Sequence, residues 1–269
     1  MLKLLCSTGC LCTLRNGRDY RLIEKAAREL RCDGFEFMMY GSWYDLWQSV
    51  ASDIRGMGLN IPVMHVEKRV GERITLGETE EARRVFRINC EMGVRLGAEK
   101  LVLHLWDGKP SDGNFLANAE EYAVLNGIAR EYGLLLTVEN VVCLYNDPLT
   151  NLTKLREMHP DISFTYDFKM AQFHDQVKRT FDSENMWLWD GAVRHVHFSD
   201  IDADPMDWTK LRSLHPGEGR VDFPFVCENL KAAGYSDYIT IESTSVAEDG
   251  TIEVEKLNNS LARIREYME

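Results

Sequence analysis

Eight short runs of apolar and β-branched residues alternate with amphipathic helical patterns along this chain of 269 residues. The expected strands cover residues 2–7, 34–40, 61–67, 100–106, 134–140, 162–168, 193–199 and 238–243. Such alternation is typical of a parallel sheet whose helices form right-handed crossovers. Eight units fit a closed (β/α)8 TIM barrel better than an open sheet, which would place a glycine-rich phosphate loop after its first strand. Residues 7–10 hold no such loop.

Helical patterns fill the stretches between these strands. They cover residues 18–30, 43–55, 78–96, 114–132, 148–158, 223–233 and 253–267, with a less regular pattern over 170–189. In the third of them, Val85, Ile88 and Met92 recur at three- and four-residue steps and therefore share one face. No linker, low-complexity tract or shift in composition divides the sequence. We therefore expect one domain over residues 1–269.

The composition indicates a globular protein with an excess of acidic groups. Apolar residues make up 45% and charged residues 28% of the chain, which allows a large core. The net charge of −12 opposes binding to phosphate backbones, so no nucleic-acid partner is expected. No apolar stretch approaches the roughly 18 residues that span a bilayer, so no membrane partner is expected. The 7 cysteines follow no disulfide spacing, which favours reduced thiols and a cytoplasmic location.

Polar residues stand at the ends of the last four expected strands. In a closed barrel, residues at i and i+2 of a strand share a face, and active sites lie at the C-terminal strand ends. The four residues in that position are Glu139, Asp167, His197 and Glu242, and one step below them lie Thr137, Thr165, His195 and Thr240. Three carboxylates and an imidazole that converge inside a barrel cannot all stay ionised without compensation. The pattern therefore predicts one divalent metal ion held by these four side chains.

The same rule selects residues on the earlier strands. Glu36, His65 and His104 each lie within an apolar run, where an ionisable group without a partner is costly. We expect all three to face the substrate pocket. Two alternatives stay open for His65 and His104, which are a second metal site and a purely structural role. Glu36 is expected to support a ligand or to face the substrate rather than to bind metal, and Trp106 is expected to form an apolar wall of the pocket or part of the core.

Five sequence motifs carry a resemblance to a known family. They are Val138-Glu-Asn140, Thr165-Tyr-Asp167, His195-Val-His-Phe-Ser-Asp200, His215-Pro-Gly-Glu-Gly-Arg-Val-Asp-Phe223 and Ile241-Glu-Ser243. With these motifs the chain resembles the xylose isomerase-like TIM barrels, a superfamily of sugar isomerases and epimerases that also contains endonuclease IV. The resemblance implies a metal bound by Glu139, Asp167, His197 and Glu242, with Glu139 and Glu242 as the acid/base pair. It implies Mn²⁺, Co²⁺, Mg²⁺ or Zn²⁺ as the ion, and an oxygen-rich site with one nitrogen suits Mn²⁺ or Co²⁺.

The sequence departs from the family pattern at two places. Many members carry a histidine three residues after the strand-six aspartate, where this chain has Met170. Ketose 3-epimerases place an arginine shortly after the strand-seven histidine, where this chain has residues 201–205 instead. Lys169 or Arg220 is expected to take over part of this substrate recognition, and the alternative for both is an ordinary surface charge.

These features predict a divalent-metal-dependent isomerase or epimerase for a sugar or a related polyol ketone, which acts by proton transfer through a metal-stabilised enediolate. An inosose-type dehydratase would use the same site. A non-catalytic sugar-binding barrel is a further alternative, since a fold alone does not establish catalysis. Endonuclease IV-like DNA repair is disfavoured by the net charge and by Met170. The sequence leaves open the exact substrate, the native metal and the oligomeric state, a homo-oligomer included.

Overall fold

The computed structural model describes residues 2–269, and its eight strands form a closed parallel barrel in sequence order. The strands are β1 (Lys3–Ser7), β2 (Gly34–Met38), β3 (Val63–His65), β4 (Lys100–Leu103), β5 (Leu135–Glu139), β6 (Ser163–Asp167), β7 (Val193–Phe198) and β8 (Tyr238–Ile241). The predicted (β/α)8 barrel is thereby confirmed, with each strand inside its expected range.

Helices connect the strands, as predicted. They are α1 (Leu22–Ala27), α2 (Trp47–Gly56), α3 (Arg69–Thr75), α4 (Thr79–Leu96), α5 (Phe115–Glu131), α6 (Pro148–Met158), α7 (Phe168–Phe173), α8 (Phe223–Ala232) and α9 (Val254–Met268). The irregular pattern over 170–189 corresponds to the end of α7 followed by the 3-10 turns Arg179–Phe181 and Ser183–Leu188. Helix α3 has no counterpart among the predicted helices.

Two compact units make up the chain. Unit 1 contains the residues up to Glu36 together with Tyr166–Glu269, and unit 2 contains Phe37–Thr165. The boundaries fall inside β2 and β6, so neither coincides with a loop. The expectation of a single domain over residues 1–269 stays a prediction.

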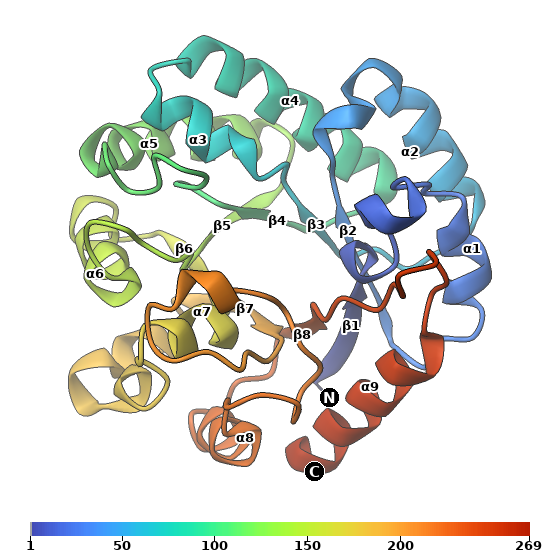
Figure 1. Ribbon diagram of the computed structural model, residues 1–269. Coiled ribbons are helices and arrows are strands. Elements are labelled where there is room, and N and C mark those ends of the chain that lie inside the picture. Colours follow the sequence, from blue (N-terminus) through green and yellow to red (C-terminus); the bar gives the residue numbers. More distant parts are fainter. Residues whose placement is uncertain (1) are drawn as a thin grey trace. The chain divides into compact units, whose positions relative to one another are not determined.

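In unit 2, α2 to α5 lie outside the strands β3 to β5 (Figure 1). The register pairs His65 with Val102, Val102 with Thr137, and Glu139 with Thr165. Helix α3 packs tightly against the end of β4, because a Cβ on Gly71 would overlap the backbone of His104 and Leu105. This close approach holds the chain that follows β4 against the strand ends.

In unit 1, β8 pairs with both β1 and β7, and α8 and α9 lie outside these strands (Figure 1). The register pairs His197 with Thr240, and Ser7 with Glu36. The loop that follows β7 is held at the end of that strand by Asp200, a fully buried carboxylate. Its Oδ2 accepts hydrogen bonds from the backbone N–H groups of Gly217 and Gly219 at 2.9 and 2.8 Å.

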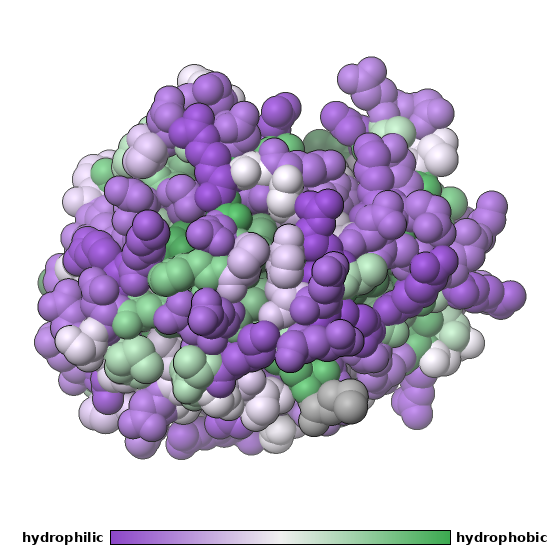
Figure 2. Space-filling model, turned by 90° about the horizontal axis from the view of Figure 1, so that it is seen from below, coloured by the Kyte–Doolittle hydropathy of each residue, from purple (hydrophilic) through white to green (hydrophobic). Residues whose placement is uncertain are grey.

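The surface is mainly hydrophilic on the face drawn in Figure 2, with smaller groups of apolar side chains between the polar ones. Among residues 2–269, no helix combines the length and the apolar composition that a membrane span requires.

Candidate functional site

Three potential metal ligands gather at the strand ends of unit 1. Asp167 ends β6, His197 lies near the end of β7, and Glu242 directly follows β8. Each offers one ligand atom, and these atoms lie within 4.8 Å of one another. Nδ1 of His197 is 3.4 Å from Oε2 of Glu242, and their side chains are 0% and 8% exposed. Two carboxylates and one imidazole this close together form a donor set that suits a divalent cation.

Asp167 is held by the helix that follows it. Its Oδ1 caps α7 by accepting hydrogen bonds from the backbone N–H groups of Lys169 and Met170 at 2.6 and 3.1 Å. The ammonium group of Lys169 lies 3.9 Å from Oδ2 of Asp167 and 3.0 Å from the hydroxyl of Ser213. The predicted substrate residue Lys169 therefore stands beside a predicted ligand, while Met170 is buried at the position of the missing histidine.

Glu36 lies below this group and connects three strands of unit 1. Its Oε2 accepts hydrogen bonds from Nε2 of His195 at 2.7 Å, from Nε2 of His197 at 3.0 Å and from the hydroxyl of Thr240 at 2.8 Å. All four side chains are fully buried. Burial alone would raise the pKa of Glu36, but the two histidines hold it well below its ordinary value. Glu36 is therefore ionised, and its predicted contact with substrate stays a prediction.

In unit 2, Glu139 lies between two histidines. Its Oε2 is 3.2 Å from Nε2 of His65 and 2.9 Å from Nε2 of His104. Nδ1 of His104 in turn contacts Oδ2 of Asp107 at 2.8 Å. Burial would lower the pKa of His104, but Glu139 and Asp107 together raise it to about 9. The sequence predicted Glu139 as a metal ligand and His65 and His104 as residues of the substrate pocket, and these roles stay predictions. Their contact with one another was not predicted.

The second nitrogens of these histidines define what the group can hold. Nδ1 of His65 donates to the backbone carbonyl of Val66 at 2.8 Å, and Nδ1 of His104 faces the carboxylate of Asp107. Neutral rings with these tautomers direct their Nε2 lone pairs at Glu139. A proton or a cation between Nε2 of His104 and Glu139 would offset this opposition of lone pairs. The raised pKa of His104 favours a proton on its ring. A divalent cation could replace that proton, so the alternative of a second metal site stays open.

Two further predicted substrate residues have other partners in the structure. Trp106 is fully buried, and its indole N–H donates to the carbonyl of Val141 at 3.1 Å. Arg220 has a side chain that is 44% exposed, and it pairs with Asp202 and Asp204. In the structure Trp106 belongs to the core, and Arg220 is a surface charge with acidic partners. Contact of either residue with substrate stays a prediction.

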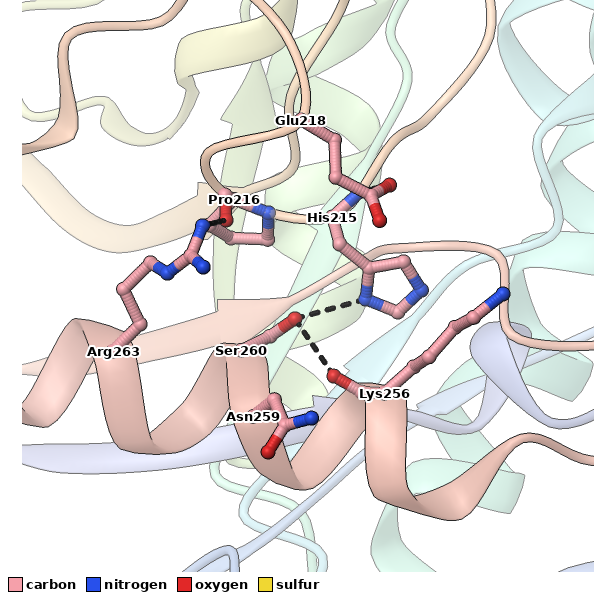
Figure 3. A pocket seen from close by; sticks show the side chains of 7 residues that line it. All are labelled: His215, Pro216, Glu218, Lys256, Asn259, Ser260 and Arg263. Carbon is pink, nitrogen blue, oxygen red and sulfur yellow. Dashed lines mark hydrogen bonds between the residues drawn. The ribbon is translucent and has the colours of Figure 1, made fainter.

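His215, which directly precedes the PGEG sequence of residues 216–219, faces α9 of unit 1 (Figure 3). Its Nδ1 contacts the hydroxyl of Ser260 at 2.8 Å, and its Nε2 contacts the hydroxyl of Ser245 at 3.1 Å. Burial lowers its pKa below the ordinary value despite the nearby Glu218, which favours a neutral ring. Across the same pocket, Arg263 donates to the carbonyl of Pro216 at 2.6 Å. The contacts with Ser260 and Arg263 fasten the loop to α9.

Sequence reasoning assigned no role to Asp107 and Asp200. Asp107 follows His104 by three residues just beyond β4, and this spacing is the only signal that could have indicated their contact. Asp200 belongs to the motif that starts at His195, and its backbone contacts with the PGEG loop explain why the two motifs occur together.

The comparisons with known proteins identify the family of this barrel. The family model described as the xylose isomerase-like TIM barrel matches residues 25–267. The chain belongs to this family. The comparison of this xylose isomerase-like barrel with curated proteins finds no sequence match.

Several solved structures share the fold of this xylose isomerase-like barrel. The 3-keto-D-glucoside 4-epimerase YcjR from E. coli is 18% identical, with a TM-score of 0.67 over 99% of this chain and 100% of that one. D-psicose 3-epimerase from Clostridium cellulolyticum H10, solved with D-tagatose, is 12% identical, with a TM-score of 0.72 over 99% of each chain. The IolI protein with a bound zinc atom is 15% identical, with a TM-score of 0.72 over 99% of this chain and 98% of that one.

Proposed function

We propose that this protein is a divalent-metal-dependent isomerase or epimerase for a small polyhydroxylated aldehyde or ketone. The observation that carries the proposal is the group formed by buried Asp167 and His197 with half-buried Glu242, whose ligand atoms lie within 4.8 Å of one another. Family membership supports it, because several structures with this fold are sugar epimerases. A carbohydrate is accordingly the proposed substrate.

Glu139 is the proposed fourth ligand. It ends β5, which pairs with β6, the strand that ends in Asp167. With it, the donor set becomes three carboxylates and one imidazole. A divalent ion fits this donor set, because its positive charge keeps ionised the carboxylates that burial would otherwise neutralise. Oxygen-rich ligation with a single nitrogen favours Mn²⁺ or Co²⁺ over ions that prefer several nitrogen or sulfur ligands.

When bound, the ion would act as a Lewis acid toward the carbonyl oxygen and the neighbouring hydroxyl oxygen of the substrate. The chain's own residues would carry the proton. One of Glu139 and Glu242 removes the proton from the carbon beside the carbonyl, and the other delivers a proton to the opposite face or to the neighbouring carbon. His65 and His104 hold Glu139 from one side at 3.2 and 2.9 Å, which fixes the direction of its carboxylate.

The proposal is tested by proton exchange in D₂O. Wild-type protein loaded with Mn²⁺ or Co²⁺ is incubated with a panel of ketoses and inosose-like ketones, and loss of the α-proton signal is followed by NMR. Glu139→Gln and Glu242→Gln should each reduce exchange by at least about a hundredfold, the scale of general acid–base catalysis. Full activity in either variant would rule out its acid/base role.

Glu121→Gln is the matched control, because the side chain of Glu121 is also largely buried, at 8% exposed, but pairs with Arg83 on the outer helices. Its exchange rate should equal that of the wild type. The products then separate the reaction types, since an epimerase inverts one carbon, an isomerase moves the carbonyl, and a dehydratase releases water. Metal binding without exchange on the whole panel would favour the sugar-binding barrel instead.

A further inference from the structure

Three side chains of unit 1 direct their hydrogen bonds at a single oxygen atom, Oε2 of Glu36. The donors are Nε2 of His195 at 2.7 Å, Nε2 of His197 at 3.0 Å and the hydroxyl of Thr240 at 2.8 Å. The side chains involved are fully buried. The proposed proton transfer uses none of these contacts, so the network needs another explanation.

The network determines which nitrogen of His197 carries a hydrogen. Oε2 of Glu36 also faces Nε2 of His195 and the hydroxyl of Thr240, so it serves as the shared acceptor of the three groups, and Nε2 of His197 is assigned as the N–H nitrogen. A neutral imidazole has one N–H, and its lone pair is then on Nδ1. Nδ1 is also the nitrogen that lies 3.4 Å from Glu242, another proposed ligand. The lone pair of His197 is therefore on the side of the ring where the cation would be held.

We propose that Glu36 is a positioning residue that fixes the Nε2–H tautomer of His197 and thereby makes Nδ1 its coordinating nitrogen. This inference rests on the proposed function for the identity of the ligand group. His195 and Thr240 complete the arrangement, because their hydrogen bonds hold Oε2 of Glu36 in place. Carboxylates that orient a metal-binding histidine in this way typically change metal affinity by about 10–100-fold when they are removed.

The same residues could instead form a cation site of their own, since Glu36, His195 and His197 also offer ligand atoms within 4.8 Å of one another. The geometry favours hydrogen bonds. Both histidine nitrogens and the Thr240 hydroxyl approach the same oxygen at distances of 2.7 to 3.0 Å. These are ordinary donor–acceptor lengths, and a cation bound at this oxygen would have to displace the hydrogen bonds that it accepts.

The first test reads the tautomer directly, without metal or substrate. Metal-free protein labelled with ¹⁵N in its histidines is studied by long-range ¹H–¹⁵N NMR, and the His197 signals are assigned by their loss in His197→Gln. The wild type should show the Nε2–H tautomer. Glu36→Met removes the acceptor and should shift His197 toward Nδ1–H, whereas Glu36→Gln keeps a carbonyl acceptor and should retain Nε2–H. Thr137→Val is the control, because it alters a buried hydroxyl that bonds Thr165 instead of Glu36.

The second test measures the dissociation constant of Mn²⁺ by competition with a fluorescent chelator. Binding should weaken about 10–100-fold in Glu36→Met, by less in Glu36→Gln, and not in Thr137→Val. Zn²⁺-loaded wild type should show the metal-induced ¹⁵N shift at Nδ1 of His197, whereas a shift at Nε2 would overturn the inference.

The outcomes separate this inference from the proposed function. If the wild type binds no metal but shows the Nε2–H tautomer, and Glu36→Met changes it, the metal proposal fails and the positioning role stands. If Glu36→Met binds Mn²⁺ as tightly as wild type and leaves the tautomer unchanged, Glu36 has no such role. Should Glu36→Met not fold, the wild-type tautomer and Glu36→Gln decide, because an Nδ1–H ring in the wild type contradicts the inference by itself.

Discussion

Asp200 should be the most sensitive position of the loop that follows β7. Its Oδ1 accepts hydrogen bonds from the backbone N–H groups of Ile201 and Val221 at 2.8 and 3.0 Å. Its Oδ2 accepts two more from Gly217 and Gly219 at 2.9 and 2.8 Å. An asparagine has only one carbonyl oxygen, so Asp200→Asn can satisfy one pair of donors and turns an NH₂ group toward the other pair.

The free-energy cost follows from this count. An unsatisfied buried N–H costs about 1–3 kcal/mol, so two of them would cost about 2–6 kcal/mol. Gly217 is exposed and Gly219 is half-buried, so water replaces part of the lost bonding when they are the unsatisfied pair. We therefore expect Asp200→Asn to lower the free energy of unfolding by about 2–4 kcal/mol.

Urea denaturation followed by circular dichroism measures this loss as a lower midpoint at an unchanged slope. Asp202→Asn is the matched control, because Asp202 is two residues away, has a side chain that is 57% exposed and pairs with Arg220 on the surface. Removal of such a surface pair should change the free energy of unfolding by at most about 1 kcal/mol. If Asp200→Asn behaved like this control, the reasoning that assigns the loop's order to Asp200 would be refuted.

Three other measurements test separate features. Gly219→Ala should destabilise by about 1–3 kcal/mol, because the new Cβ would overlap Asp200 and the backbone of Ile201, and the effect should not add to that of Asp200→Asn in a double-mutant cycle. Asp112→Asn should destabilise by about 1–3 kcal/mol at pH 7, because the Asp112 carboxylate accepts N–H groups from Leu144 and Tyr145. Burial would raise the pKa of Asp112, but these donors lower it. The carboxylate therefore stabilises the fold above pH ~3.9, and this stabilisation is lost as the pH falls through the folded-state pKa. The difference in free energy of unfolding between wild type and Asp112→Asn should accordingly be smaller at pH 3 than at pH 7. Mn²⁺ at about a hundred times its dissociation constant should stabilise the protein by about 2.7 kcal/mol, and a rise in thermal midpoint that survives excess chelator would contradict this.

The strand pattern and its ends were predictable because both depend on local sequence. Each strand is a short apolar run, and strand parity places Glu139, Asp167 and His197 on the inner face without knowledge of their partners. Helix α3 was missed because its seven residues are too few to show a helical period. The pattern over 170–189 was interpreted as an irregular helix, but beyond α7 it consists of 3-10 turns.

Side-chain partners were beyond sequence reasoning. Glu36 bonds His195 and His197, which lie 159 and 161 residues away, and nothing local to β2 indicates that pairing. Arg220 shows the same limit. The sequence left open whether it binds substrate or is an ordinary surface charge, and the structure shows ion pairs with Asp202 and Asp204 that the sequence did not predict.

The central claim is that Asp167, His197 and Glu242, together with Glu139, hold a divalent metal ion. Elemental analysis of the purified wild type and of Glu242→Ala tests it most directly, with Glu121→Gln as the control. The account predicts a near-stoichiometric divalent metal in the wild type and in the control, and its loss in Glu242→Ala. A wild-type protein that stays empty after incubation with Mn²⁺, Co²⁺ and Zn²⁺ would contradict the metal site and the proposed reaction with it.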